Sequence, residues 1–305
     1  MENLRGVFPV IPTPFTAANT PDEAAFIRLL DFALSSGANG LVFPGMASEV
    51  ETLSEQERGK LVAVAGAHIA GRVPFIVGAS DADPAKAAAR AREGKAAGAV
   101  AAMVMAPPAA GVDVDKQIAY FTAVAAQAGL PIMLQNAPPP NGAGLSPDKV
   151  AAVAKAVAGV RYVKEETLPC GQNVTRILDG AKEHVDAVFG GAGARYVIDE
   201  LARGAAGTMP AIEIADIHAR LWAAWQRGDT AEARRLYNVS LPLLAFQMVF
   251  RVRATKEVLR RRGLLAETKA RAAGPVLDAD DQNELVALLA DMKSLFERDV
   301  PVLKD

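Results

Sequence analysis

The sequence predicts an α/β fold of the TIM-barrel type, a closed (β/α)8 barrel with a C-terminal helical appendage. Three observations predict it. Short apolar runs recur along the first three quarters of the chain, most of them follow a small residue and a glycine, and they lie roughly 20 to 35 residues apart, as successive βα units do. The runs are rich in Val, Ile, Met and Ala without polar alternation, which indicates strands buried on both faces of a parallel sheet.

Eight candidate strands follow one another along the chain. Five come after a glycine that we expect just past a helix C-terminus, in the left-handed conformation that suits glycine; these are Gly37, Gly98, Gly129, Gly159 and Gly204. The eight runs are "GVFPVIPTP" (6–14), "SGANGLVFPG" (36–45), "VPFIVGAS" (73–80), "AGAVAAMVMAP" (97–107), "AGLPIMLQNAP" (128–138), "AGVRYVKEE" (158–166), "HVDAVFGG" (184–191) and "RGAAGTMPA" (203–211).

The intervening stretches read as helices with recognisable starts. Residues 20–23, Thr-Pro-Asp-Glu, predict a capping box with proline at the first helical position. Residues 54–57 repeat the box, and Ser146-Pro147 opens another helix. An open doubly wound sheet is the alternative, but it requires a glycine-rich phosphate loop after the first strand, and "VIPTPF" is not one.

From about Gly228 the strand signals stop and amphipathic helical patterns take over, in 229–250, 254–265 and 278–300. We therefore predict a catalytic barrel over 1–227 and a C-terminal helical region over 228–305. The Arg260–Arg262 cluster is expected to be a solvated helix end.

Composition excludes several classes of protein. The 305 residues carry a formal net charge of -2 with no basic stripe, which argues against a nucleic-acid partner. A single cysteine suits a reducing compartment, and neither a signal peptide nor an apolar stretch of membrane-spanning length is evident. These features predict a cytoplasmic protein without a membrane partner.

The sixth run carries the most informative side chains. Because side chains alternate along a strand, Lys164 and Glu166 are expected on one face and Glu165 on the other. Reactive groups of such barrels gather at the C-terminal ends of the strands, and a lysine amine there can form a Schiff base with a carbonyl compound. The alternative is that Lys164 is only half of an ion pair with Glu165 or Glu166.

Four segments resemble the dihydrodipicolinate synthase/N-acetylneuraminate lyase family: "GVFPVIPTPF", "GLVFPGMASEVETLSEQER", "PIMLQNAPPPNGAGLSPD" and "VRYVKEET". The C-terminal "ATKEVLRRRGLL" fits as well, so the likeness extends over nearly the whole chain. The resemblance implies a Schiff-base lyase on a (β/α)8 barrel, a homotetramer, with Lys164 as the imine-forming residue.

Departures from the family pattern narrow the expected reaction. Where synthases and aldolases carry Gly-Thr-Thr-Gly-Glu, this chain has residues 45–49, Gly-Met-Ala-Ser-Glu, and Gln135 occupies the position of their strand-five tyrosine. "PPPNGAG" offers no arginine for a distal carboxylate, so dihydrodipicolinate synthesis is not expected. "Q-x-A-P" from Gln135, Lys-x-Glu-Thr from Lys164 and the Ser48-Glu49 pair resemble the 2-keto-3-deoxy-L-arabonate dehydratase branch.

The resemblance implies a dehydration in which Lys164 forms the imine and Glu166 moves a proton from C3 to the departing C4 hydroxyl. The imine is the electron sink, so no cofactor is expected. His68, His184 and His218 lack metal-ligand spacing, so no metal is expected either. The partner is a small 2-oxo acid. Its carboxylate is expected on the N–H groups of Ala47 and Ser48 and on the Ser48 hydroxyl.

The remaining expectations concern the walls of the site. Gln135 and Asn136 are expected to hold substrate hydroxyls or a water, although Gln135 could instead be a structural amide, and Glu49 is expected to buttress its loop. Thr167 is expected either to orient the imine or to cap the next helix. Gly190 and Gly207 are expected to be pocket walls.

Three other readings stay open. A pyruvate aldolase would cleave a 2-keto-3-deoxy acid through the same Schiff base. A related cyclic imino acid could be deaminated or dehydrated. A barrel without catalysis could bind 2-oxo acids as a regulatory protein, although Lys164 beside Glu166 argues against it.

Overall fold

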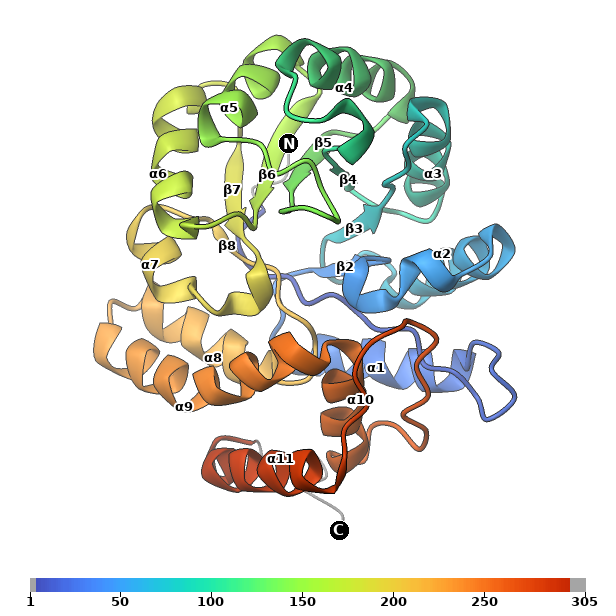
Figure 1. Cartoon of the computed structure of the whole chain (residues 1–305), viewed down its shortest axis with the longest axis vertical. Coiled ribbons are helices and arrows are strands. Elements are labelled where there is room, and N and C mark those ends of the chain that lie inside the picture. Colours follow the sequence, from blue (N-terminus) through green and yellow to red (C-terminus); the bar gives the residue numbers. More distant parts are fainter. Residues whose placement is uncertain (1–3, 297–305) are drawn as a thin grey trace.

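The computed structural model describes residues 4–296, and it confirms the predicted fold class. Eight parallel strands alternate with helices that surround them (Figure 1). The strands coincide with the eight predicted runs: β1 Gly6–Val7, β2 Leu41–Phe43, β3 Phe75–Gly78, β4 Ala101–Met105, β5 Ile132–Asn136, β6 Val160–Glu165, β7 Ala187–Gly190 and β8 Gly207–Thr208.

The sheet closes on itself just after β1. Its strand order is β1-β8-β7-β6-β5-β4-β3-β2, and Val10 bridges in parallel to both Val42 of β2 and Ala211 beyond β8. Closure removes the free strand edges and excludes the open doubly wound sheet.

Two apolar clusters lie on the two faces of this sheet. The smaller cluster holds strand and loop residues without any helical residue, among them Phe8, Met103, Met133, Tyr162 and Phe189, and it fills the barrel. The larger takes the alternate strand residues together with the inner faces of the helices. Burial on both faces is the reason that the strands read as continuous apolar runs.

The helices that cover the barrel are α1 Glu23–Ser35, α2 Glu55–Ile69, α3 Pro84–Ala96, α4 Val114–Ala128, α5 Pro147–Ala156, α6 Cys170–Ala181, α7 Val197–Ala202 and α8 Ala215–Gln226. Short 3-10 turns precede several of them: η1 Met46–Ser48, η2 Val50–Thr52, η3 Pro108–Ala110 and η4 Ala192–Ala194. None of the helices within residues 4–296 is long and apolar enough to cross a membrane.

Two of the predicted helix starts are confirmed, and one is displaced. Ser54 and Glu57 form the reciprocal capping box of α2, and Ser146 precedes α5. The predicted box at residues 20–23 is wrong, because α1 begins later: Asp22 is the N-cap and accepts a hydrogen bond from the Ala25 N–H at 2.9 Å.

Four of the five helix-ending glycines have the predicted left-handed backbone: Gly37, Gly98, Gly129 and Gly204. Gly159 does not. A Cβ atom at Gly159 would lie 2.6 Å from the Cβ atom of Ala125 in α4, so close packing against a helix, and not backbone conformation, explains this glycine.

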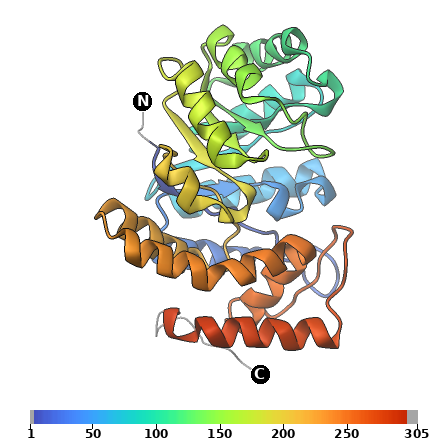
Figure 2. The same cartoon turned by 60° about the vertical axis from the view of Figure 1, so that its left-hand side comes forward.

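The C-terminal region is helical as predicted, with α9 Thr230–Phe250, α10 Val252–Arg261, α11 Ala279–Met292 and the short turn η5 Lys293–Leu295. Figure 2 shows these helices packed against one side of the barrel. The last residues of the predicted third helix lie outside the described range. The predicted boundary at 227/228 falls between α8 and α9, and the division into two domains stays a prediction.

Arg262 corrects the expectation of a solvated helix end. Its guanidinium is 1% exposed and forms an ion pair with Asp216 of α8 at 2.7 Å. It also lies over the rings of Phe32 and Phe296. The two preceding arginines of the cluster pair with Glu257.

Candidate active site

The site begins at the end of β6, where Lys164 faces the barrel interior. Tyr162, two residues earlier on the same face, belongs to the interior cluster. Lys164 is 4% exposed, and its Nζ atom lies 2.8 Å from Oε1 of Glu166. The predicted alternation of side chains is therefore observed, and a buried amine contacts a nearly buried carboxylate at the catalytic end of the barrel.

Gln135 completes this cluster from the neighbouring strand. It is the register partner of Lys164 across β5 and β6, and its Nε2 atom donates to Oε2 of Glu166 at 3.1 Å. Each carboxylate oxygen of Glu166 thus receives a hydrogen bond from a different strand. Gln135 is an amide tied to the candidate base, not to a loop.

Glu165 points to the opposite face of β6, into the layer between strands and helices. It is fully buried and accepts hydrogen bonds from Asn136 Nδ2 at 2.8 Å and from the Thr167 N–H at 2.7 Å. Burial raises the pKa of Glu165 to about 7, although the bonds from Asn136 and Thr167 act in the other direction.

These contacts correct the expectation for Asn136. Its Nδ2 atom also donates to the carbonyl oxygen of Leu145 at 2.9 Å, and its Oδ1 atom accepts from the Leu145 N–H at 2.9 Å. The amide is 0% exposed and committed to the protein. Asn136 alternates with Gln135 along β5, so it faces away from Lys164 and does not hold substrate.

Thr167 is also committed elsewhere. Its hydroxyl donates to Glu165 and accepts from Asn173 Nδ2 of α6 at 2.9 Å, while Pro169 is the N-cap of that helix. Neither predicted role fits, because the hydroxyl is turned to the Glu165 side and caps no helix. Thr167 ties the chain leaving β6 to α6.

At the end of β7 the glycine that faces the site is not the one predicted. A Cβ atom at Gly190 would lie 1.9 Å from Oε2 of Glu200 in α7, so Gly190 faces the outer layer and is not a pocket wall. Gly191 is the residue that faces the site, since a Cβ atom there would lie 2.3 Å from Cγ of Glu166. The sequence prediction chose Gly190, whereas its neighbour Gly191 is on the face of the chain that is turned to the site.

Glu200 is a buried acid behind this turn. Burial raises the pKa of its carboxyl group to about 8, and the negative charges of Glu165, Asp199 and Glu166 add to the rise. Neither carboxyl oxygen has a hydrogen-bond partner within residues 4–296.

Gly207 of β8 was also predicted to be a pocket wall. A Cβ atom at this position would lie 1.9 Å from the carbonyl oxygen of Gly6 in β1. The glycine permits the close approach of β8 and β1, and its place in a pocket wall stays a prediction.

The loop after β2 brings Ala47 and Ser48 to the mouth of the barrel. Ala47 packs against the interior cluster. The Ser48 hydroxyl donates to the carbonyl oxygen of Ile11 and accepts from the Gly45 N–H at 2.9 Å. The Ser48 N–H donates to the Gly45 carbonyl oxygen at 2.9 Å. Both Ser48 donors are thus engaged within the protein.

Within residues 4–296 no group of three or more His, Cys, Asp or Glu side chains could hold a metal ion. His68 pairs with Asp31 at 2.7 Å, and His218 is 2% exposed. Burial lowers the pKa of His218 to about 4. Cys170, the first residue of α6, is buried, and burial raises the pKa of its thiol to about 12, the opposite of an activated cysteine.

Comparisons with known proteins show what the chain is similar to. The model of the Dihydrodipicolinate synthetase family matches residues 3–292. An L-2-keto-3-deoxyarabonate dehydratase from Azospirillum brasilense is 30% identical over 299 residues, 96% of each chain. A 4-hydroxy-tetrahydrodipicolinate synthase from Xanthomonas campestris pv. campestris is 35% identical over 166 residues, which cover 54% of this chain and 55% of the relative.

Solved structures share the fold. YagE from E. coli K12, a prophage protein belonging to the dihydrodipicolinic acid synthase family and solved in complex with pyruvate, matches with a TM-score of 0.87. The match is 24% identical and covers 95% of this chain and 99% of that chain. The family model and the relative from Azospirillum brasilense confirm the predicted family, and the solved structure confirms the fold.

Proposed function

The chain belongs to the dihydrodipicolinate synthetase family and is a lyase, and we propose that it dehydrates a 2-keto-3-deoxy sugar acid, such as 2-keto-3-deoxy-L-arabonate, through a Schiff base on Lys164. The observation that carries the proposal is the contact of 2.8 Å between Lys164 Nζ and Glu166 Oε1 at the catalytic end of the barrel. The relative from Azospirillum brasilense, which carries that activity in its name, supports the substrate class.

The first step is imine formation. The short contact allows the ammonium proton of Lys164 to pass to Glu166, which leaves a neutral amine to attack the C2 carbonyl carbon. The new C–N bond forms, and the carbonyl oxygen leaves as water with one proton from the attacking amine and one returned by Glu166, which is then a carboxylate again. The protonated imine then draws electron density from C3 and makes its protons acidic.

The second step is elimination. Glu166 removes a C3 proton, and the electron pair forms a C2–C3 double bond while the imine nitrogen takes up the displaced pair. This enamine then forms the C3–C4 double bond and restores the imine as the C4 hydroxyl leaves as water with the proton returned by Glu166. Tautomerisation and hydrolysis of the conjugated imine give a 2-oxo semialdehyde acid and free Lys164. The product differs from the substrate by one water, and the imine is the electron sink, so the reaction needs no cofactor.

Gln135 supports dehydration over carbon–carbon cleavage. It occupies the position at which aldolases of the family carry a tyrosine, and it donates to Glu166 at 3.1 Å. An amide does not relay a proton as a phenol does. Lys164 and Gln135 hold the carboxylate of Glu166 in place. This one carboxylate serves first as base and then as acid, on one face of the substrate.

The substrate carboxylate is proposed to lie at the turn formed by Ala47 and Ser48. Because Ser48 already donates to Ile11 and Gly45, its hydroxyl must turn from Ile11 to meet a substrate. The Ala47 N–H is the second proposed donor at this position.

Borohydride trapping tests the proposal. The protein is incubated with pyruvate or with 2-keto-3-deoxy sugar acids, reduced, and analysed by intact and peptide mass. We expect an adduct on Lys164 that carries the whole sugar chain or that chain minus water. Glu166→Gln is expected to form the unreacted adduct more slowly than wild type, because the amide cannot take the lysine proton, and to lose dehydration, whereas Lys164→Met forms no adduct. A three-carbon adduct from a longer sugar acid would identify an aldolase.

We also propose a homotetramer located in the cytoplasm, the assembly and compartment that family resemblance and composition favour. Val112 and Leu168, in the loops after β4 and β6, are 50% and 68% exposed, and large apolar side chains at such positions suit contacts between copies. Light scattering on the purified protein measures the assembly, and a monomeric mass would contradict it.

A further inference from the structure

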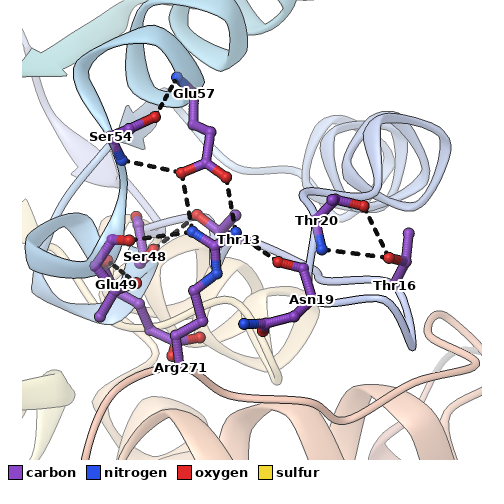
Figure 3. Close-up of polar contacts among 10 residues, drawn as sticks. Thr13, Thr16, Asn19, Thr20, Ser48, Glu49, Ser54, Glu57 and Arg271 are labelled. Atoms are coloured by element: carbon purple, nitrogen blue, oxygen red, sulfur yellow. Dashed lines mark hydrogen bonds and ion pairs between the residues drawn. The ribbon is translucent and has the colours of Figure 1, made fainter.

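The segment between α10 and α11, residues 263–278, contacts the loops that follow β1 and β2. We call it the C-terminal strap. Figure 3 shows Arg271 of the strap between Glu57 at the start of α2 and Asn19 in the first loop. Its guanidinium donates to Glu57 Oε1 at 2.7 Å and to the Asn19 carbonyl oxygen at 2.6 Å. Lys269 donates to the Ala17 carbonyl oxygen at 3.0 Å.

The C-terminal region contacts Glu49, the residue that follows the turn of Ala47 and Ser48 proposed to bind the substrate carboxylate. Its side chain is 0% exposed, and its backbone has a left-handed conformation with φ 58° and ψ 37°. A buried carboxylate requires partners, and a left-handed non-glycine residue persists only where its surroundings hold it. Glu49 therefore depends on contacts from outside its own loop.

Those contacts come from the C-terminal region. Lys256 of α10 is 0% exposed and donates to Glu49 Oε1, and the Ala272 N–H of the strap donates to Glu49 Oε2 at 2.6 Å. Lys256 also donates to the Lys269 carbonyl oxygen at 2.7 Å and lies 4.5 Å from the centre of the Phe15 ring. One buried ammonium thus joins α10, the strap and the loop after β2.

The turn held in this way contains Ala47 and Ser48. Glu49 follows them directly, and its N–H donates to the Met46 carbonyl oxygen at 3.1 Å. On the other side, Thr13 Oγ1 donates to the Ser48 carbonyl oxygen at 2.7 Å. A displacement of Glu49 would therefore change the direction of the N–H and hydroxyl groups proposed to meet the substrate carboxylate.

We propose that Glu49 and Lys256 are positioning residues through which the C-terminal region sets the affinity of the site for the carboxylate of a 2-oxo acid. The inference rests on the proposed function, because it assumes the carboxylate at Ala47 and Ser48. Neither residue takes part in the proton transfers of Lys164 and Glu166. Their loss acts on binding of the carboxylate and not on reaction at the carbonyl carbon.

The experiment compares Lys256→Met with a matched control, Arg262→Met. Both residues are buried cations of the C-terminal region with a carboxylate partner. Arg262 pairs with Asp216 of α8, and within residues 4–296 it has no hydrogen bond or ion pair to the loop after β2. Each variant is trapped with borohydride over a range of concentrations of pyruvate and of hydroxyacetone, a ketone without a carboxylate. The half-saturating concentration and the maximal trapping rate at Lys164 are measured.

For Lys256→Met we expect the half-saturating pyruvate concentration to rise about tenfold, because a small misplacement of a binding group costs one to two orders of magnitude. The value for hydroxyacetone and the maximal trapping rate stay within about twofold of wild type. Arg262→Met leaves both half-saturating concentrations unchanged even where it lowers stability. If Lys256 had only a structural role, the half-saturating concentrations of pyruvate and hydroxyacetone would rise together.

A second variant covers the case in which Lys256→Met does not fold. The double variant Glu49→Gln/Lys256→Met leaves no unpaired buried charge and is expected to fold while still binding pyruvate weakly. If either variant binds pyruvate with wild-type affinity while the wild-type protein forms its normal adduct, the inference is overturned and the proposed function stands. Absence of any adduct on wild-type Lys164 overturns the proposed function and, with it, this inference.

Discussion

Replacing Glu200 by glutamine exchanges a buried carboxyl group for a neutral amide of the same shape. In the folded chain burial raises the pKa of Glu200 from 4.5 to about 8, with nearby carboxylates adding to the rise, and among residues 4–296 neither oxygen has a hydrogen-bond partner. The charged form is therefore unfavourable in the fold. The amide resembles the protonated acid and carries no charge at any pH.

The sign of the pH effect follows from the direction of this shift. The pKa of Glu200 in the folded chain lies above 4.5, the ordinary value for glutamate that applies to the unfolded chain. The stability contributed by this group is therefore fully present below pH 4.5 and is lost as the pH rises toward 8. The pKa difference lowers the free energy of unfolding, relative to its value at low pH, by about 3 kcal/mol at pH 7 and by about 5 kcal/mol above pH 8.

Urea unfolding midpoints measured from pH 5 to 9 test this expectation. The curves of wild type and Glu200→Gln are expected to approach each other near pH 5 and to diverge as the pH rises, with the variant the more stable. Asp148→Asn, at a side chain that is 72% exposed and is not among the charges that raise the pKa of Glu200, is the control and is expected to follow wild type. Parallel curves, or a variant less stable at pH 8 than wild type, would refute the reasoning.

Three further outcomes are expected. Gly191→Ala places a methyl group 2.3 Å from Glu166 Cγ and should lower kcat more than about tenfold, whereas Gly190→Ala points to the outer layer and should lower the urea midpoint instead. Gln135→Leu removes the donor to Glu166 Oε2 and should lower kcat roughly 10- to 100-fold; a rate within about twofold of wild type contradicts the assigned contact. Because burial lowers the pKa of His218 to about 4, stability from its neutral form is present above pH 6.5 and is lost as the pH falls toward 4, so His218→Leu should flatten the urea midpoints over that range.

Short-range pattern accounts for the parts of the fold and site that the sequence predicted. Eight buried runs with a βα spacing are sufficient for a closed barrel, since parallel strands buried on both faces need helices between them. The alternation of side chains placed Lys164 and Glu166 on one face of β6 and Glu165 on the other. Periodicity is a local property, and it is read reliably from the chain itself.

The errors lie where that periodicity ends or where a partner is remote. Gly190 and Gly191 differ by one residue at the end of β7, and only the structure shows which of them faces Glu166. Asn136 resembled a substrate ligand because its partners, Leu145 and Glu165, lie 9 and 29 residues away.

The sequence by itself determined the barrel, the order of its strands and the lysine at the end of the sixth, because backbone geometry and burial pattern repeat within a few residues. Only the tertiary structure decided what surrounds that lysine. Glu49 and Lys256 are 207 residues apart in the chain and in contact in the fold, and a buried charge takes its partner from whichever element packing brings within reach.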